Sequence, residues 1–423
     1  MAKANVVIVG NGSAALAALE AIHRTDPRLK SLVISAEDCP PYSPTALPYF
    51  FAGKIREQHL FLRDDSFYRE KNAELVRGAR VVRILLQDRR VVLEDGRDVG
   101  YDKLLIATGA SPILPAIEGL NEVRHFVFRT LKDAKELLSY AEGRRKAVVL
   151  GGGLVGMETA SGLIKKGLKV TVMEKEERVL PVYFDSEAAD IIKGIYEENG
   201  VTLLTGETAV KVGMDGERVI IRTLSGREIE AEIFVVAAGM APSIEPVMDS
   251  GIACRRGILV DDTMRTNIEG VYAAGDVAEA RSFFGPEKVL NAILPDAVEQ
   301  GRVAGANIAG GDERYSGGLP LNIFSFFGNW AFSCGLPLVE GKDYKVIKRS
   351  YGYGGRYRRL VFKEGRLIGV ALINDGVDPG ILHSFIRKGT DLSELMDGLE
   401  RDLINLSRYT MIRSESPELP EAI

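Results

Sequence analysis

The chain has 423 residues, of which 46% are hydrophobic and 27% are charged, and this composition excludes a disordered or collagen-like polypeptide. At roughly 150 residues per domain, the length predicts about three domains. The formal net charge of −5 argues against bulk binding of nucleic acid, because proteins that bind it usually carry a basic surface.

Cysteine and histidine are sparse. The three cysteines, Cys39, Cys254 and Cys334, lie far apart, and the four histidines lie singly. This dispersal predicts no metal site within the chain, and it suits a reducing, cytoplasmic location. There is no apolar stretch of about 18 residues and no room for a signal peptide before the first strand, so we expect no membrane span.

The first predicted unit is a strand–turn–helix–strand. The apolar run Asn5–Val9 indicates a buried strand, and the turn Gly10-Asn11-Gly12-Ser13-Ala14-Ala15 (GxGxxA) follows it. A helix over Ala14–His23 and a strand over Leu32–Ser35 complete the unit. In such a turn the first glycine permits the tight bend and the second lets the backbone approach a pyrophosphate at the helix N-terminus.

The same pattern returns in the middle of the chain. A strand over Lys146–Leu150 precedes the full GxGxxG turn Gly151–Gly156, a helix to Lys166 and a strand over Val170–Met173. Glu174 ends that strand 23 residues after Gly151 (174 − 151), where a carboxylate commonly binds the coenzyme ribose. Two such turns predict two dinucleotides held by one chain.

After Pro320 the pattern changes to short strands and turns. Strands are expected over Lys345–Arg349, Arg359–Phe362 and Leu367–Ile373, and helices over Gly380–Lys388 and Asp391–Leu406. This reads as a smaller α+β domain. Trp330 and the phenylalanines near it are interpreted as core residues, and the segment after residue 405 as a mobile tail.

Four further segments carry a family resemblance. They are Tyr101–Gly109 (YDKLLIATG), Ala237–Pro242 (AAGMAP), Val271–Asp276 (VYAAGD) and Gln300–Arg302 (QGR). In this order the motifs resemble the pyridine nucleotide–disulfide oxidoreductase superfamily over residues 4–395. Members bind FAD at the first glycine turn and NAD(P)H at the second.

The resemblance implies an α/β fold of two nested Rossmann-like dinucleotide-binding domains with a small C-terminal α+β domain. The expected boundaries are 1–115 with 240–318 for FAD, 116–239 for NAD, 319–405 for a C-terminal interface domain, and 406–423 for the tail. The cofactors implied are FAD and NAD(H). The cofactor-binding residues are expected to be Gly10, Gly12, Ser13, Ala14, Glu37, Thr108, Gly109, Arg129, Gly151, Gly153, Val155, Gly156, Glu174, Gly239, Gly275, Asp276 and Ala297.

Three of these assignments have a specific chemistry. Asp276 is expected to accept a ribityl hydroxyl, with a helix N-cap as the alternative. Amides near Ala297 and Val298 are expected to donate to the flavin pyrimidine. Glu174 favours NADH by repelling a 2′-phosphate, although the neighbouring Lys175 and Arg178 leave NADPH open.

The departures from the family concern the catalytic residues. Thr45 replaces the cysteine of relatives that carry YSPCALPY, so no thiolate relay is expected, and Cys39 is interpreted as a small buried residue. Tyr49 occupies the position where another branch has a lysine that pairs with the residue equivalent to Glu158. Lys54, one turn further on, is the candidate replacement, and the alternative is that Glu158 binds only the nicotinamide carboxamide.

The segment Lys345–Lys363 contains seven basic residues, interleaved tyrosines that include Tyr353, and no acidic residue. One interpretation is a docking face for an acidic electron-transfer protein. The others are an RNA-binding segment and, with most weight, a solvated hairpin whose arginines stack on tyrosines.

The chain thus resembles the cysteine-less flavin subunits that link multi-subunit anaerobic dehydrogenases, of the phenylglyoxylate or tungsten aldehyde type, to NAD. We expect an oligomeric FAD-dependent NAD(H):acceptor oxidoreductase with an iron–sulfur partner subunit and no nucleic acid. The alternatives are a stand-alone NADH oxidase or rubredoxin-type reductase, and a flavin-bound redox sensor without turnover.

Overall fold

The computed structural model describes residues 4–351 and 355–401, and they fall into two compact units. The first unit contains the residues up to Pro115 together with Phe126–Gly143 and Ala237–Leu319. The second contains Ala116–His125, Arg144–Val236 and the described residues from Pro320 onward. The finer division into four segments remains a prediction, and the expected tail, 406–423, lies outside the described residues.

The first unit is built on a sheet in the order β3-β2-β1-β6-β5-β4. Strands β3, β2, β1 and β6 are parallel, and β17 adds a further parallel strand beside β6. Strand β5 pairs with β6 and with β4 in antiparallel fashion. The strands of this sheet are β1 (Ala4–Val9), β2 (Ser31–Ile34), β3 (Ala73–Val76), β4 (Val81–Leu85), β5 (Arg90–Leu93), β6 (Asp98–Ile106) and β17 (Val271–Ala273).

Two small sheets and five α-helices complete this unit. The sheets pair β7 (Ala110–Pro112) with β15 (Met240–Pro242), and β18 (Ala278–Arg281) with both β16 (Ile258–Leu259) and β19 (Lys288–Val289). The α-helices are α1 (Ser13–Thr25), α2 (Leu47–Phe51), α3 (Asp65–Glu70), α4 (Leu131–Ala141) and α7 (Leu294–Ile308).

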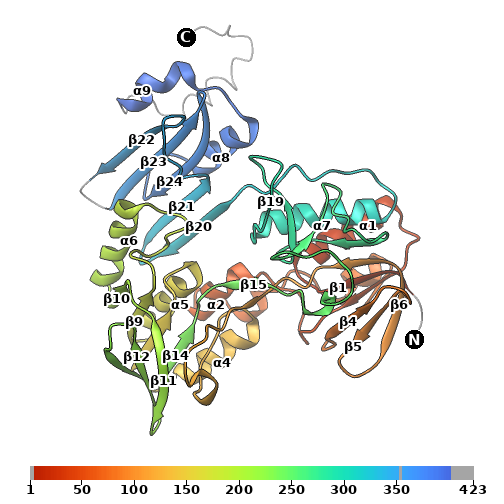
Figure 1. Cartoon of the computed structure of the whole chain (residues 1–423), viewed down its shortest axis with the longest axis horizontal. Coiled ribbons are helices and arrows are strands. Elements are labelled where there is room, and N and C mark those ends of the chain that lie inside the picture. The colour runs from red at the N-terminus through yellow and green to blue at the C-terminus, as the bar shows by residue number, and fades with distance from the viewer. Residues whose placement is uncertain (1–3, 352–354, 402–423) are drawn as a thin grey trace. The chain divides into compact units, whose positions relative to one another are not determined.

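Helices α1 and α7 lie side by side in the first unit (Figure 1). A Cβ atom added to Gly301 or Gly305 would lie about 2 Å from the carbonyl oxygen of Ala14 or Ala18 (2.1 and 2.2 Å). Glycine therefore lets the two backbones touch, and this contact sets the start of α1 beside the middle of α7.

The second unit contains a parallel sheet in the order β10-β9-β8-β14 and an antiparallel sheet β11-β12-β13. Helices α5 (Leu154–Lys165) and α6 (Ser186–Glu198) accompany them. The strands are β8 (Lys146–Leu150), β9 (Lys169–Glu174), β10 (Val201–Thr205), β11 (Ala209–Asp215), β12 (Arg218–Thr223), β13 (Glu228–Ala231) and β14 (Ile233–Val236).

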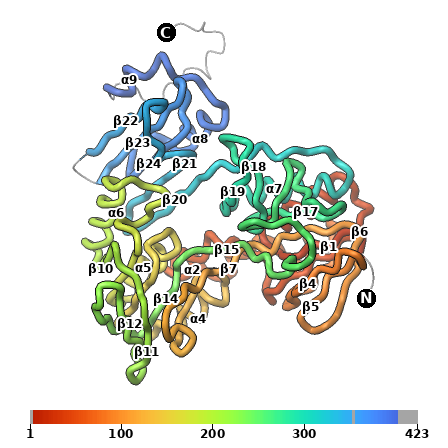
Figure 2. The backbone as a smooth tube through the Cα atoms, in the orientation of Figure 1, coloured from red at the N-terminus to blue at the C-terminus, as the bar shows by residue number. Residues whose placement is uncertain are grey.

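A five-stranded antiparallel sheet, β20-β21-β24-β23-β22, forms the C-terminal part of the second unit. Helix α6 lies beside β20 in Figure 2. Tyr196 on α6 stacks on Phe326 with 5.4 Å between the ring centres and meets Phe327 edge-on at 5.0 Å. The elements are β20 (Leu321–Phe326), β21 (Asn329–Gly335), β22 (Lys345–Tyr351), β23 (Arg356–Lys363), β24 (Arg366–Ile373), α8 (Pro379–Lys388) and α9 (Met396–Glu400).

The predicted α/β fold is confirmed, and most predicted elements lie within a few residues of those observed. The helix predicted from Asp391 is wrong at its start. The Asp391 carboxylate accepts hydrogen bonds from the amide and hydroxyl of Ser393, which closes a turn there, and α9 begins only at Met396. Within the described residues, no helix is long and apolar enough to cross a membrane.

Candidate functional site

The first glycine turn leaves open space where its second glycine lies. Gly10 follows β1 with φ +111°, and an added Cβ would lie 2.1 Å from the carbonyl oxygen of Ala107. Only glycine fits there, because β6 passes close behind the turn. A Cβ on Gly12 would instead meet no atom within 4 Å. Packing therefore requires the first glycine, whereas the second borders a space that the protein leaves unfilled.

The second glycine turn repeats this arrangement. Gly151 has φ +113° and donates its amide hydrogen bond to Met173 on β9 at 2.7 Å. Gly153 precedes α5, and a Cβ there would meet no atom within 4 Å. A Cβ on Gly152 would lie 2.9 Å from the Cβ of Glu174, so the turn is packed tightly against the strand that carries the predicted ribose ligand.

The helices that follow these turns begin without a capping side chain. Neither α1 after Gly12 nor α5 after Gly153 has one, and α7 also lacks one. By contrast, side chains cap α4 (Thr130), α6 (Asp185) and α8 (Asp378). An uncapped N-terminus leaves amide donors and the positive end of the helix dipole for an anion. Beside open glycines, both turns fit the pyrophosphate of a dinucleotide.

The AAGD turn brings several predicted cofactor residues together in the first unit. A Cβ added to Gly275 would lie 3.1 Å from the Cβ of Ala14 and 3.7 Å from that of Ala297. The Gly275 amide donates to the side-chain oxygen of Gln300 at 2.8 Å. The AAGD turn therefore packs between the first turn of α1 and the first turn of α7. The Ala297 amide donates to the Ile293 carbonyl at 3.1 Å within the helix, and the contact of amides near Ala297 and Val298 with a flavin stays a prediction.

Asp276 does not cap a helix. Its Oδ2 accepts a hydrogen bond from Nη2 of Arg129 at 2.9 Å, and the next element is the strand β18. Arg129 also donates through Nε to the carbonyl of Ala110 at 3.1 Å. A Cβ added to Gly109 would lie 3.6 Å from Arg129 Nη2. The ATG and AAGD motifs therefore meet at one arginine.

Thr108 and Gly239, two further predicted cofactor residues, lie where the chain leaves the first unit and where it returns to it. Thr108 donates its hydroxyl hydrogen bond to the carbonyl of Ser243 at 2.8 Å, and the amide of Ile113 donates to the carbonyl of Gly239 at 2.9 Å. These hydrogen bonds flank the antiparallel pairing of β7, in the segment that leaves the unit, with β15, in the segment that returns.

Glu37 is engaged by a tyrosine that sequence reasoning missed. Tyr42 donates its hydroxyl to Glu37 Oε2 at 2.8 Å and accepts from the amide of Leu131 at 3.0 Å. Burial raises the pKa of Glu37, and the hydrogen bond from Tyr42 opposes that rise. The carboxyl group that was predicted to meet the FAD ribose thus also anchors the start of α4. A tyrosine in a proline-flanked loop gives no sequence signal for this contact.

Glu174 holds the second turn. Its Oε2 accepts from the Gly152 amide at 2.7 Å and its Oε1 accepts from the Glu176 amide at 2.9 Å, and the residue is 8% exposed. Arg178 donates to the carbonyls of Phe184 and Pro181. Its guanidinium is therefore used within the loop, which weakens the option of an arginine waiting for a 2′-phosphate.

The predicted catalytic residues of the first unit lie in the loop and helix before β3. Thr45 is exposed, and its hydroxyl pairs with that of Ser43 at 2.8 Å. The ammonium of Lys54 lies 5.1 Å from the ring centre of Tyr49, so these two residues are brought together. Cys39 is half-buried, and burial, with the negative charge of Glu37, raises its pKa to about 11.

Glu158 lies in the second unit, on α5, with Val155 and Gly156 in the preceding turn of the helix. It follows Met157, whose carbonyl accepts from the hydroxyl of Tyr196 at 3.1 Å. The pairing of Glu158 with a lysine of the first unit stays a prediction.

The basic segment is not an open docking face. Arg358 and Arg359 are buried: Arg358 forms a bidentate pair with Asp375, and Arg359 pairs with Asp185 and Glu340. Lys348 pairs with Asp185 and Glu187, Lys345 pairs with Glu400, and Arg356 stacks on Tyr351. The docking interpretation is therefore wrong for most of the segment, because acidic residues distant in sequence neutralise it. Tyr353 lies outside the described residues.

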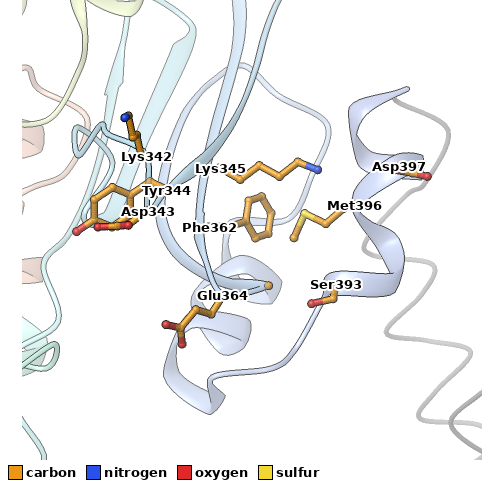
Figure 3. Close-up of a pocket in the computed structure, with 10 residues that line it drawn as sticks. Lys342, Asp343, Tyr344, Lys345, Phe362, Glu364, Ser393, Met396 and Asp397 are labelled. Carbon is orange, nitrogen blue, oxygen red and sulfur yellow. The ribbon is translucent and has the colours of Figure 1, made fainter.

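A hollow of about 460 Å³ lies in the C-terminal part of the second unit. Figure 3 shows the Phe362 ring and the Met396 side chain facing each other there, with Lys345 alongside. None of the sequence-predicted site residues lines it. Its lining residues are Lys342, Asp343, Tyr344, Lys345, Phe362, Glu364, Gly365, Ser393, Met396 and Asp397.

Comparisons with known proteins agree with this geometry. Residues 4–301 match the family model described as pyridine nucleotide-disulphide oxidoreductase. The chain is 41% identical over 410 residues, 96% of each chain, to the NADH-dependent phenylglyoxylate dehydrogenase subunit epsilon of Aromatoleum evansii. It is 30% identical over 391 residues, 87% of each chain, to an NADH oxidase of Methanocaldococcus jannaschii. The solved NAD-dependent persulfide reductase from A. fulgidus is 27% identical, with a TM-score of 0.85 over 97% of this chain and 84% of that one.

Proposed function

Because the chain belongs to the pyridine nucleotide-disulphide oxidoreductase family, an enzyme family that binds FAD and NAD(H), we propose that it passes electrons between NAD(H) and an iron–sulfur partner subunit. The observation that carries this proposal is the 41% identity, over nearly the whole of both chains, with a relative named as a subunit of an NADH-dependent dehydrogenase. That name makes phenylglyoxylate the first substrate to test with the assembled complex.

In this proposal the FAD pyrophosphate binds at the first turn and NAD(H) binds at the second. The open side of Gly12 and the uncapped start of α1, with Ser13 and Ala14, would hold the FAD pyrophosphate. Asp276 would accept a ribityl hydroxyl, and the ion pair with Arg129 keeps that carboxylate oriented. When bound, FAD supplies two-electron exchange with the nicotinamide and one-electron exchange with a partner.

At the second turn, the open side of Gly153 and the uncapped start of α5 would hold the NAD(H) pyrophosphate. Glu174 is directed at this turn by its bond to the Gly152 amide. Its negative charge would accept the ribose 2′-hydroxyl and repel a 2′-phosphate, which supports NADH as the coenzyme.

The absence of a thiol relay supports an external electron acceptor. Thr45 stands where relatives have the reactive cysteine, and a hydroxyl forms neither a disulfide nor a thiolate at neutral pH. The half-buried Cys39 keeps its proton, since its pKa is raised to about 11. Electrons that reach FAD would therefore leave to another molecule rather than to a cysteine of this chain.

Acceptor preference of the FAD-loaded chain tests the proposal. Anaerobic NADH is expected to bleach the flavin absorbance, and a ferredoxin-type protein or a one-electron dye is expected to reoxidise it quickly. Oxygen and disulfides are expected to reoxidise it slowly. Rapid consumption of NADH in air would instead favour a stand-alone oxidase, the activity for which the relative from M. jannaschii is named.

A further inference from the structure

Asp185 joins the C-terminal sheet to the coenzyme-binding part of the second unit. It caps α6 by accepting the Ala188 amide at Oδ1 (3.1 Å). Its Oδ2 accepts the hydroxyl of Tyr357 at 2.7 Å and lies 3.1 Å from Lys348 Nζ and 3.3 Å from Arg359 Nη1. One carboxylate therefore serves a helix start and three donors from β22 and β23.

The charges around Asp185 stabilise this junction at neutral pH. Burial alone would raise the pKa of Asp185, but hydrogen bonds from Tyr357, the Ala188 amide and Lys348 outweigh it and lower the pKa. Lys348 also pairs with Glu187 at 2.7 Å, and only 4% of the Arg359 side chain is exposed. Such shielded, charge-assisted contacts are stronger than exposed ion pairs.

Asp185 ends the loop that begins at Glu174. We call residues 175–184 the coenzyme loop. The amide of Leu180 in this loop donates to the carbonyl of Gly152 at 2.9 Å, and Glu174 accepts the Gly152 amide at 2.7 Å. The carbonyl of Gly152 is thus bonded to the coenzyme loop, and its amide is bonded to Glu174 at the end of β9. Leu180 has φ +51°, a left-handed conformation that a leucine keeps only when its surroundings impose it.

We propose that the C-terminal sheet positions the coenzyme loop, and through it the turn Gly151–Gly156, for NAD(H), with Asp185 and Tyr357 as positioning residues. The inference rests on the proposed place of NAD(H) at this turn. The physical sequence of contacts runs from Tyr357 to Asp185, then through the buried Phe184 and Leu180 to Gly152. If the sheet contact is lost, the strained loop can relax and Gly152 loses a fixed partner.

The variant that isolates this contact is Tyr357→Phe combined with Lys348→Met. It removes two donors to Asp185 but leaves the α6 cap and the Arg359 contact in place. The matched control is Lys345→Met. Lys345 lies on β22 like Lys348, but its ammonium pairs with Glu400 and not with Asp185. The holoprotein is titrated with NADH and with ADP-ribose by calorimetry, FAD retention is measured by fluorescence, and urea unfolding checks that each variant folds.

The double variant is expected to bind NADH and ADP-ribose at least about five-fold more weakly than the wild type, with FAD retention unchanged. Its KM for NADH with ferricyanide is expected to rise by a similar factor, while kcat changes less than about two-fold. Lys345→Met is expected to match the wild type. If the double variant does not fold, Tyr357→Phe alone is expected to show the same effect at about two-fold.

Equal NADH affinity in the folded variant and the wild type would overturn the positioning role while leaving the proposed function intact. A wild-type holoprotein that does not bind NADH would overturn the coenzyme assignment itself, and the positioning role with it. Equal weakening in Lys345→Met would show a general effect of lost positive charge and would likewise overturn the proposal.

Discussion

Arg129 and Asp276 are 147 residues apart in the sequence, and an ion pair of 2.9 Å joins them. The pair links the segment before α4 to the AAGD turn between α1 and α7. Because Arg129 also bonds Ala110 beside the ATG motif, its side chain sets the position of the ATG and AAGD motifs relative to each other. Both side chains are partly exposed, at 28% and 18%, which leaves the carboxylate reachable by a ligand while the arginine orients it. This arrangement fits the proposed role of Asp276 as an acceptor for a ribityl hydroxyl.

Replacing Arg129 with methionine is expected to weaken FAD binding about ten-fold, which corresponds to about 1.4 kcal/mol. The reason is that Asp276 loses its counter-charge and the turn loses its anchor to Ala110. Titration of the apoprotein with FAD, followed by flavin fluorescence, measures the affinity. Arg63→Met is the control, because Arg63 pairs with Glu20 at 2.9 Å on the surface. Equal affinity in the two variants would contradict the role of Arg129.

Alanine at Gly10 is expected to lower the stability of the apoprotein, whereas alanine at Gly12 is expected to lower its affinity for FAD. Gly10→Ala should destabilise the apoprotein by about 3 kcal/mol or more, because φ is +111° and the new Cβ would overlap the Ala107 carbonyl. Gly12→Ala should leave apoprotein stability unchanged but weaken FAD binding, because its methyl group enters the open space. Urea unfolding with and without FAD separates the two. An unchanged FAD affinity in Gly12→Ala would place the pyrophosphate elsewhere.

Glu174→Gln is expected to lower the preference for NADH over NADPH by about ten-fold. The amide keeps an oxygen that can accept the Gly152 amide, but the negative charge that repels a 2′-phosphate is gone. The ratio of kcat/KM values for the two coenzymes reports the change. Glu176→Gln in the same loop removes an exposed carboxylate that pairs with Lys175, and it should keep the wild-type ratio. A wild-type ratio in Glu174→Gln would rule out Glu174 as the selector.

The activity is expected to be independent of thiol chemistry. Burial raises the pKa of Cys39 to about 11, so at pH 8 only about 0.1% of this thiol is ionised. The thiolate fraction grows as the pH approaches 11, and alkylation should become faster in that direction. Ferricyanide reduction by NADH should therefore survive iodoacetamide at pH 8, and Cys39→Ser should be as active as the wild type. Rapid inactivation at pH 8 that Cys39→Ser abolishes would show a working thiolate.

Much of the fold could be predicted from the sequence because its signals are local. A continuous apolar run, a glycine-rich turn and a helix recur at Asn5–His23 and Lys146–Lys166, and each sets its own backbone conformation. The open space beside Gly12 and Gly153 also agrees with the motif, in which the second glycine lets the backbone approach a pyrophosphate.

The missed features depend on long-range pairing. The sequence left a docking face open as an alternative for the basic segment because its acidic partners, such as Asp185 for Arg359, lie up to 174 residues away. The hairpin, the interpretation with most weight, agrees with the pairing of β22 with β23 and with Arg356 stacked on Tyr351. The bond from the Leu131 amide to Tyr42 and the bond from Arg129 to Asp276 depend on how the chain crosses between motifs, which no local pattern records.

Purification of the intact assembly from its native source, with the mass and iron content of what co-elutes, tests the central claim most directly. The account predicts that this yellow flavoprotein elutes with an iron-containing subunit, and that the assembly moves electrons between NAD(H) and that subunit's iron. A lone flavoprotein free of iron that oxidises NADH rapidly in air would contradict the account and identify a stand-alone oxidase.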